Sequence, residues 1–347
     1  MIPVARGHDA SAAAPPRTRR IGVIGTFVWD VIHGRDARSV PVEEWGGITY
    51  TLSGLDAALP DEWEIVPIMK VGFDLAERAR AYIGTLRHIA PDAGLVEVPY
   101  AGHRVELRYI DDERRTEVLT GAIPGWSWVG LKPLIDEARL DALYINFLSG
   151  WELDLPTAQM LRAHFAGPIH CDLHMMVMAV QPDGLRTPRP IPNVAEWCGC
   201  FDFLQMNEEE MATIAPDSMS LAATALAAGV SCLLVTLGKR GAIYVAAPGF
   251  DTICDLPPRG GLATAPRGGT GALGAVRTAL VPAEIVNGSG DPTGCGDVWG
   301  ATYFSRMVAG DRLSDAMIAA TRAAARNVEH RGATGLAAHL RGELSLS

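Results

Sequence analysis

Residues 288–310, GSGDPTGCGDVWGATYFSRMVAG, join a glycine-rich turn directly to an apolar, helix-forming run. Gly294, Cys295 and Gly296 are small residues at the expected start of the helix, so their backbone N–H groups can point outward toward an anion. The helix dipole adds partial positive charge at the same place. Asp297 follows at once, and a carboxylate there is suited to act as a base beside a phosphoryl group. The alternative is a plain helix N-cap, because Asp often precedes a helix and Gly marks turns.

Short apolar runs elsewhere in the chain predict the buried strands of a parallel sheet. IGVIG at 21–25 is such a run, and similar ones occur at 64–71, 142–148, 168–173, 201–206 and 232–238. Helix-like stretches lie at 75–89, 155–165 and 312–330. The alternation predicts an α/β fold with a doubly wound, mostly parallel sheet and helices on both faces.

Other segments depart from this alternation. Residues 103–119, HRVELRYIDDERRTEVL, alternate polar and apolar side chains around a turn-like DDER, which predicts an antiparallel hairpin. We expect a small β lid over the site, built from segments at about 33–50 and 97–122. The Gly-, Pro- and Ala-rich residues 257–275 should form a flexible loop. The tail at 1–20 should be disordered, so we expect the folded domain over 21–347.

Composition argues against several classes of protein. The chain has 347 residues and a formal net charge of -10, whereas a nucleic-acid partner needs a basic face. No apolar run of about 18 residues occurs that would span a membrane. Six cysteines in a chain of this length do not make a disulfide framework. The N-terminal tail also lacks the apolar core of a secretory signal, so we expect a cytoplasmic protein.

Other motifs of chemical interest fail on their spacing. LGKRG at 237–241 lacks the spacing of a P-loop, and GVIG at 22–25 lacks the dinucleotide-binding fingerprint. HCDLH at 170–174 matches no common zinc pattern. Asp172 and His174 follow a predicted strand, where the ligands of doubly wound sheets gather. Ligand contact and hydrogen bonding within the core both stay open for these two residues.

The glycine-rich turn also carries a resemblance to a known family. DPTGCGD at 291–297 resembles the DTxGAGD signature of the PfkB, or ribokinase-like, sugar and nucleoside kinases. Further matches follow the order of the family's motifs along the chain: GTFVWD (25–30), EEWGG (43–47), VGFD (71–74), DERRTEVL (112–119), NEEE (207–210) and TLGKRG (236–241). The resemblance covers roughly residues 20–340 and implies a ribokinase-like fold.

The resemblance implies roles for residues on the donor side of the site. Asp297 would be the general base, and the amides of Gly294, Cys295 and Gly296 would form the anion hole for the transferring phosphoryl. Asn207 and Glu210 match positions that place Mg²⁺ and the phosphates through water, while an exposed helix acid is the alternative for Glu210. The nucleotide side is matched by Thr236, Gly238 and Gly241, and more weakly by Asn327 and Gly332.

On the acceptor side, the resemblance points to the end of the first strand and to the paired glycines. Asp30 would bond substrate hydroxyls, with strand-end capping as the alternative, and Gly46 and Gly47 would let the backbone approach the sugar. Thr51 stands where many members have Asn, so the usual sugar contacts do not transfer intact. Cys295 replaces a usual Ala; a small buried filler is favoured there over a reactive thiol.

Together these features predict ATP-dependent phosphorylation of a hydroxyl of a sugar or sugar-like molecule. The implied cofactors are ATP and Mg²⁺, with a monovalent cation as an open addition. A nucleoside kinase and a catalytically degenerate binding or assembly protein are the alternatives. The apolar face of the lid hairpin, with Val105 and Leu107, must cover either the site or a second lid. We therefore expect a homodimer through the lid, a small-molecule acceptor, and neither nucleic-acid nor membrane partners.

Overall fold

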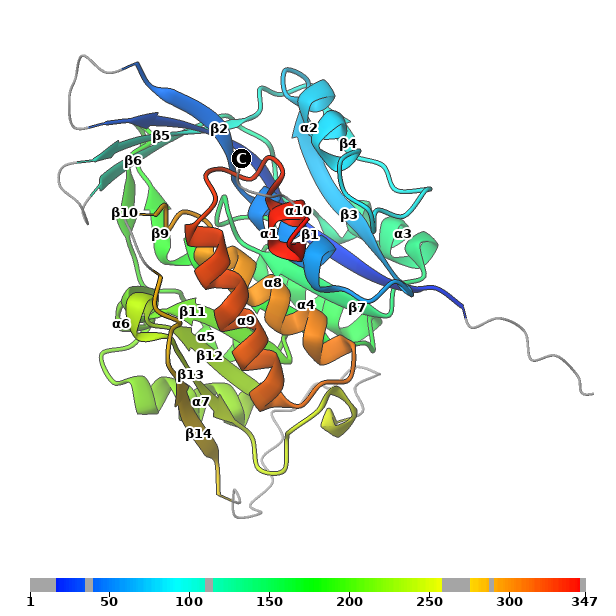
Figure 1. Cartoon of the computed structure of the whole chain (residues 1–347), viewed down its shortest axis with the longest axis vertical. Helices are drawn as coiled ribbons and strands as arrows, with labels where there is room; N and C mark the ends of the chain where they lie inside the picture. The colour runs from blue at the N-terminus through cyan, green and yellow to red at the C-terminus, as the bar shows by residue number, and fades with distance from the viewer. Residues whose placement is uncertain (1–16, 35–39, 110–114, 258–274, 287–289, 344–347) are drawn as a thin grey trace, which may run out of the picture.

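The parallel strands predicted from the apolar runs form one large sheet in the computed structural model, which describes residues 17–34, 40–109, 115–257, 275–286 and 290–343 (Figure 1). The main path runs β14-β13-β12-β11-β8-β7-β1-β3-β4. Its strands are β1 (Arg19–His33), β3 (Trp63–Gly72), β4 (Val96–Val98), β7 (Ala142–Asn146), β8 (Ile169–Asp172), β11 (Phe203–Asn207), β12 (Cys232–Thr236), β13 (Ala242–Ala246) and β14 (Arg277–Val281). The pairs from β12 to β4 are parallel, and β13 and β14 add antiparallel pairs at one edge.

Helices cover both faces of this sheet, as the alternation predicted. Consecutive residues of β1 contribute to opposite faces: Val23 belongs to one buried apolar cluster and Ile24 to the other. The first cluster includes side chains from α1 (Ile48–Ala58), α8 (Cys295–Val308), α9 (Leu313–Val328) and α10 (Leu336–Arg341). The second includes side chains from α3 (Trp128–Ala138), α4 (Leu155–His164), α5 (Val194–Cys198) and α7 (Ser218–Ala228). This double cover explains why the central strands of the sheet are largely apolar.

A small β layer extends from the end of β1, as the lid prediction required. The second half of β1 pairs antiparallel with β2 (Val42–Gly47) and parallel with β5 (His103–Tyr109). The antiparallel pairing of β5 with β6 (Arg115–Thr120) confirms the predicted hairpin. Because α1 begins at Ile48, the first lid segment ends at Gly47 rather than at residue 50. Most of the DDER turn lies in 110–114, outside the described residues.

The apolar face of the lid is buried within the single chain. Val105 and Leu107 are only 3% and 5% exposed. A two-stranded hairpin, β9 (Met178–Val180) with β10 (Arg186–Pro188), lies beside the lid, where the Leu119 amide donates to the Gly184 carbonyl at 2.9 Å. The chain itself thus covers these two side chains, so they give no support to a lid-to-lid homodimer, which stays a prediction.

Other boundaries differ from the predictions for local reasons. Arg19 and Arg20 already belong to β1, so the ordered chain begins before residue 21. The helix expected over 75–89 is α2 (Ala76–Ile83), which stops at Gly84. The short α6 (Glu208–Ile214) follows β11. Residues 1–16 of the expected tail and 258–274 of the expected loop lie outside the described residues.

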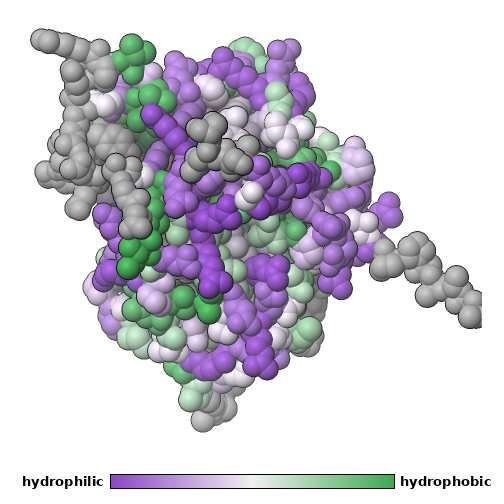
Figure 2. All heavy atoms as spheres, in the orientation of Figure 1, coloured by the Kyte–Doolittle hydropathy of each residue, from purple (hydrophilic) through white to green (hydrophobic). Residues whose placement is uncertain are grey.

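The helices and the surface composition can be compared with those of a membrane-crossing protein. Within the described ranges, no helix is both long and apolar enough to cross a bilayer. Figure 2 shows that hydrophilic side chains cover much of the face that carries α8 and α9, with small apolar groups between them.

Candidate active site

The carboxyl ends of four neighbouring parallel strands bring polar side chains to one edge of the sheet. Asn146, Asp172, Asn207 and Thr236 are the last residues of β7, β8, β11 and β12. Register pairs join Asn146 to Asp172 and Asn207 to Thr236. Ligands of open α/β sheets bind outside this edge, so it is the natural place for a site.

Asp297 lies in the first turn of α8, among these strand ends. Its side chain is buried, with 8% of the residue exposed. Asn146 Nδ2 donates to Asp297 Oδ1 at 2.6 Å, and Thr51 Oγ1 donates to the same oxygen at 3.3 Å. Among the described residues these hydrogen bonds all end on Oδ1, which leaves Oδ2 as the oxygen that can take a proton. This arrangement is what a general base needs, because the carboxylate is oriented and one oxygen is available.

The environment of Asp297 also sets its protonation. Burial raises the pKa of this carboxyl above its ordinary value, and the charge of Glu210 raises it further. The charge of His174 and the hydrogen bonds from Asn146 and Thr51 lower the same pKa. A raised carboxyl pKa brings the base closer to the pH at which it would work.

The turn before Asp297 supplies backbone amides at the N-terminus of α8. Gly294 is the N-cap and has φ 73°, a conformation that favours glycine. A Cβ at Gly296 would meet nothing within 4 Å, so the backbone there faces open space. The Cys295 amide donates to the Pro292 carbonyl at 3.2 Å. The Cys295 amide is therefore already occupied in this structure, and an anion hole made by the amides of Gly294 and Gly296 stays a prediction.

Cys295 itself behaves as a filler. Its thiol lies 3.3 Å from Asn327 Nδ2, and burial raises the pKa of the thiol to about 11. A thiol with that pKa is protonated at neutral pH, so the structure favours the packing interpretation over a reactive cysteine.

Asn207 and Glu210 form a reciprocal capping box at the start of α6. The Glu210 amide donates to Asn207 Oδ1, while Glu210 Oε2 accepts from the Asn207 amide, both at 2.8 Å. Asn207 Nδ2 also donates to Glu210 Oε1 at 2.8 Å. Glu210 is buried, so the alternative of an exposed helix acid is wrong.

His174 completes this group from the segment after β8. Its Nδ1 lies 3.3 Å from Glu210 Oε1. Burial alone would lower the pKa of His174, but Glu210, Asp297 and Asp172 together raise it to about 9. The backbone of His174 has φ 32°, which is uncommon for a residue with a side chain. His174 is thus a basic imidazole beside Glu210, with Asp172 and Asp297 near it.

The residues present fit a hydrated Mg²⁺ better than a directly bound one. Within the described part of the chain, no group of three or more His, Cys, Asp or Glu side chains is placed to hold a metal ion directly. Both oxygens of Glu210 already accept hydrogen bonds from Asn207. A carboxylate can still accept from water, and Mg²⁺ usually keeps several waters, so Asn207 and Glu210 fit contact with the ion through water.

The predicted acceptor residues meet where β1 pairs with β2. Asp30 is buried, and a Cβ at Gly46 would lie 2.1 Å from Asp30 Oδ2. Only glycine fits beside that carboxylate. Gly47 has φ 47° and ends β2 just before α1, where a Cβ would lie 2.6 Å from a Leu148 side-chain atom. Glycine is thus favoured at the two positions for different reasons: Gly46 makes room for the Asp30 carboxylate, and Gly47 has a positive φ and lies against Leu148.

Thr51 lies on α1 between the acceptor residues and the base. It is fully buried, accepts from Asn146 Nδ2 at 3.0 Å, and donates to Asp297. Its hydroxyl is thus used to orient Asp297, and contact with an acceptor stays a prediction.

On the predicted nucleotide side, Thr236 is followed by a short 3-10 turn at Gly238–Arg240. Gly238 and Gly241 have φ 55° and 103°. A Cβ at Gly241 would lie 2.0 Å from the Val281 carbonyl oxygen, so glycine is required there. An ion pair between Arg240 and Glu208 joins this turn to α6. The turn therefore lies beside the Asn207–Glu210 cap.

Asn327 is placed differently from a pocket-lining residue. It is fully buried, and Nδ2 donates to the Thr293 carbonyl at 2.8 Å. In this structure it fastens α9 to the turn that carries the anion hole. A contact with adenine stays a prediction for Asn327, as it does for Gly332.

Sequence reasoning did not single out Asn146 or Gln205. Gln205 Nε2 donates to Asp172 Oδ2 and to the Gly296 carbonyl, both at 2.9 Å, so it ties β8 to the start of α8. Asn146 was hidden because the apolar run continues past it through residue 148. Its place at the end of a strand was the signal that could have found it.

Solved structures of similar fold give this site a context. No protein-family model matches the sequence, and no curated protein matches it significantly. The Arabidopsis thaliana ribokinase complexed with ribose and ATP is 15% identical, with 96% of this chain and 100% of that chain covered and a TM-score of 0.64. The Burkholderia thailandensis nucleoside kinase in complex with inosine is 14% identical, with 92% and 94% covered and a TM-score of 0.65.

A third similar structure uses another phosphoryl donor. It is a pyrophosphate-dependent kinase in the ribokinase family, complexed with a pyrophosphate analogue and myo-inositol. Its identity is 16%, with 90% of this chain and 96% of that chain covered and a TM-score of 0.66. At these identities the likeness shows the fold: the chain has the ribokinase-like fold, which confirms the expected fold class.

Proposed function

We propose that this protein transfers a phosphoryl group to a hydroxyl of a sugar or sugar-like small molecule. The observation that carries the proposal is Asp297, a buried carboxylate in the first turn of α8, oriented through Oδ1 by Asn146 and Thr51. A carboxylate that only capped the helix would not need two side chains from other elements to orient it. Asp297 also lies at the N-terminus of α8, where an anion can bind. This position disfavours a degenerate binding or assembly protein.

The proposed chemistry follows from positions within the site. An acceptor held by Asp30 and by the backbone at Gly46 and Gly47 presents a hydroxyl to Asp297, whose Oδ2 removes its proton. The hydroxyl oxygen then attacks the terminal phosphorus of the donor, and the bond from that phosphorus to the leaving oxygen breaks. The amides of Gly294 and Gly296 stabilise the negative charge on the phosphoryl oxygens.

Mg²⁺, when bound near Asn207 and Glu210 through water, would neutralise charge on the phosphates. His174 adds a positive charge of the protein's own next to Glu210. A monovalent cation remains part of the resemblance, and no contact in the described residues singles out a place for it.

ATP is the proposed donor, and it is supported by the ATP-bound ribokinase of similar fold. Pyrophosphate is a second candidate, because the pyrophosphate-dependent kinase has a comparable TM-score. A nucleoside acceptor is the alternative to a sugar, since the similar nucleoside kinase was solved with inosine.

We also place the protein in the cytoplasm. All six cysteines are free thiols, and four of them are buried in the core. This usage is typical of a reducing compartment.

A donor-by-acceptor matrix tests the proposed function. The purified chain is incubated with Mg²⁺ and either ATP or pyrophosphate, and with ribose, glucose, myo-inositol, inosine or adenosine, and phosphorylated products are detected by mass spectrometry. We expect one acceptor class to yield a monophosphate with one donor. No product from any pair, with acceptor binding intact by calorimetry, would favour the degenerate binding protein.

A further inference from the structure

The lid carries a second carboxylate, Glu44, on the acceptor side of the site. Asp30 and Glu44 are directly paired in the antiparallel register of β1 and β2, so their side chains share a face. Glu44 Oε2 lies 2.9 Å from where a Cβ of Gly332 would be. Gly332 belongs to the turn between α9 and α10, which passes close to β2 in Figure 1. Glu44 therefore lies between Asp30 and that turn.

The charge of Glu44 is poorly compensated. Its Oε1 is buried and has no hydrogen-bond partner among the described residues. Burial raises the pKa of Glu44, and the negative charge of Asp291 raises it further, while Arg331 lowers it. Burying a carboxylate oxygen without a donor is costly, so a donor from a ligand would stabilise it.

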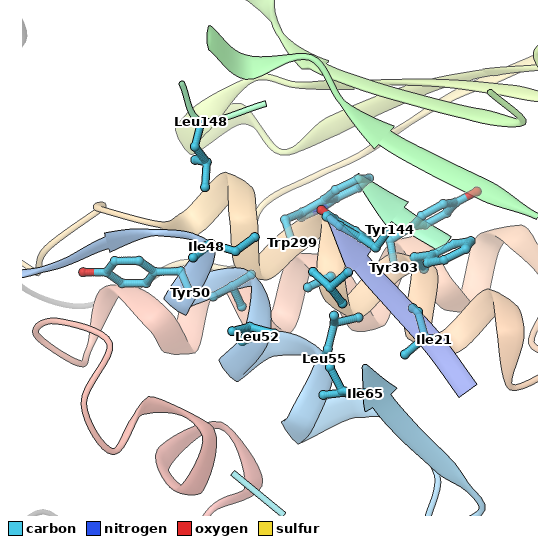
Figure 3. Close-up of a cluster of buried hydrophobic side chains, with 14 of the residues drawn as sticks. Ile21, Ile48, Tyr50, Leu52, Leu55, Ile65, Tyr144, Leu148, Trp299 and Tyr303 are labelled. Carbon is cyan, nitrogen blue, oxygen red and sulfur yellow. The ribbon is translucent and has the colours of Figure 1, made fainter. Parts of the chain in front are cut away.

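Tyr50 carries a second buried polar atom without a partner in the described part of the chain, near enough to Glu44 to be affected by its charge. It is 1% exposed, and its ring lies against Gly294, where a Cβ would be 2.1 Å from a ring carbon. Its hydroxyl is buried without a hydrogen-bond partner in the described chain. Figure 3 shows the ring projecting away from the packed cluster with the hydroxyl at its far end.

The surroundings of that hydroxyl are acidic. Burial, and then the charges of Glu44, Asp291, Asp30 and Asp297, raise the pKa of Tyr50 far above its ordinary value. The group therefore stays a neutral hydroxyl, which can accept one hydrogen bond and donate another. A buried hydroxyl and a buried carboxylate oxygen, both without partners, thus lie within one acidic region.

The chemistry of this region selects among acceptors. A phosphate or carboxylate on the acceptor would be repelled by the carboxylates. A neutral hydroxyl could donate one hydrogen bond but would bring no charge. A protonated amine brings a positive charge and three donors, enough for Glu44 and Tyr50 together.

We infer that Glu44 and the Tyr50 hydroxyl hold a protonated amine of the acceptor, which makes the acceptor an amino sugar or an aminocyclitol. The inference rests on the proposed function, because an acceptor exists only if the protein transfers a phosphoryl group. It adds the substrate class and two specificity-determining residues.

Matched acceptor pairs test this inference. Glucosamine is compared with glucose, and an amino-inositol with myo-inositol, at fixed KCl and Mg²⁺. The wild type should prefer the amine in at least one pair by kcat/KM. Glu44→Gln keeps the size of the side chain and should reduce kcat/KM for that amine by about tenfold or more, because a hydrogen bond to a charged group is lost. Tyr50→Phe should reduce it in the same direction.

The neutral partner of each pair and a neighbouring residue serve as controls. Glu44→Gln should reduce kcat/KM for the hydroxyl compound by a smaller factor than for its amine partner, because a neutral hydroxyl brings no charge to the carboxylate. Glu43→Gln is the matched variant: Glu43 lies next to Glu44 on β2 but is exposed and accepts from Trp29 Nε1 at 2.9 Å. Its selectivity should equal that of the wild type. Equal losses for amine and hydroxyl in Glu44→Gln would overturn the inference.

Calorimetry without a donor separates this inference from the proposed function. If an amine binds the wild type more tightly than its hydroxyl partner, and Glu44→Gln removes that preference, the inference stands even where no product forms. If the amines bind no better than the hydroxyl compounds, the inference is wrong although the kinase may work. If the effect of Glu44→Gln depends on the KCl concentration and not on the acceptor, the region binds an inorganic cation. That result also overturns the inference.

Discussion

At the scale of single residues, the site depends on how Asp297 is oriented. Asn146 and Thr51 reach its Oδ1 from β7 and α1, and they also bond to each other. The base therefore belongs to a buried network that spans three elements. A sequence motif gives the carboxylate, but only the folded chain brings in the amide that orients it.

Removing the Asn146 amide should move the pH dependence of the reaction. The base works when deprotonated, so activity falls as the pH drops through its pKa. The bond from Asn146 lowers that pKa, so Asn146→Leu should raise it and shift the acid limb of kcat/KM to higher pH by about one unit. Ser305→Ala, on the same helix but bonded to the Ala301 carbonyl, is the control. An unshifted limb in Asn146→Leu would remove Asn146 from the network of the base.

Asp30 should affect the acceptor and not the donor. Its carboxylate lies beside Gly46 on the lid side of the site, so Asp30→Ala should weaken acceptor binding by about tenfold or more through lost charge-assisted hydrogen bonds. The KM of the donor should stay near that of the wild type. A comparable rise in both KM values would mark Asp30 as a structural residue of β1.

At the scale of elements, α6 shows how one pair of residues can have two roles. The resemblance assigned Asn207 and Glu210 to Mg²⁺ and phosphates, and the structure shows that they also form the capping box of α6. The two roles make different demands: capping needs hydrogen-bonding atoms, whereas attraction of a hydrated cation needs the negative charge.

Two variants separate these demands. Glu210→Gln retains a carbonyl oxygen for the Asn207 amide but loses the charge and the acceptor for Asn207 Nδ2. The Mg²⁺ concentration needed for half-maximal activity should therefore rise, and Tm should fall slightly. Asn207→Ala loses the N-cap and should destabilise the protein by about 1 kcal/mol. Activity titrations with Mg²⁺ and thermal unfolding of both variants provide the check. An unchanged Mg²⁺ requirement in Glu210→Gln would leave Glu210 with the capping role alone.

The lid gives a prediction about assembly as well as binding. Because Val105 and Leu107 are buried within the chain, Val105→Asp with Leu107→Asp should disorder the lid and raise the acceptor KM. The oligomeric state should not change. Sedimentation of both proteins and far-UV circular dichroism of the variant provide the measurements. A wild-type dimer that the variant splits would restore the lid-to-lid interface.

Elements differ in how well their sequences predicted them. The central strands β1, β7, β11 and β12 have side chains in both buried clusters, so their sequences are largely apolar. The edge strand β14 is largely exposed along its length and has no comparable apolar run, which is why it was missed. The helix predicted over 75–89 is longer than α2, because the helical spacing of apolar residues continues past Gly84, where α2 ends.

At the scale of the whole molecule, topology explains what the sequence alone could not. The parallel pairing of β7, β8, β11 and β12 places Asn146, Asp172, Asn207 and Thr236 at one edge, although 90 positions of chain separate the first from the last. The helix dipole of α8 points at the same edge with Asp297. The order of the motifs predicted Asp297 as the base, the glycines, and Asn207 with Glu210. Their positions relative to Asn146, Gln205 and His174 depend on the order of the strands in the sheet.

Asp297→Asn removes the proposed base of phosphoryl transfer. Asn keeps the size of the side chain and an oxygen for Asn146, but it cannot take a proton. With the donor and acceptor found active in the matrix, turnover should fall by about 10²–10⁴. Donor affinity, measured by calorimetry on the same preparation, should stay near that of the wild type. Wild-type turnover in Asp297→Asn would show that Asp297 is not the base.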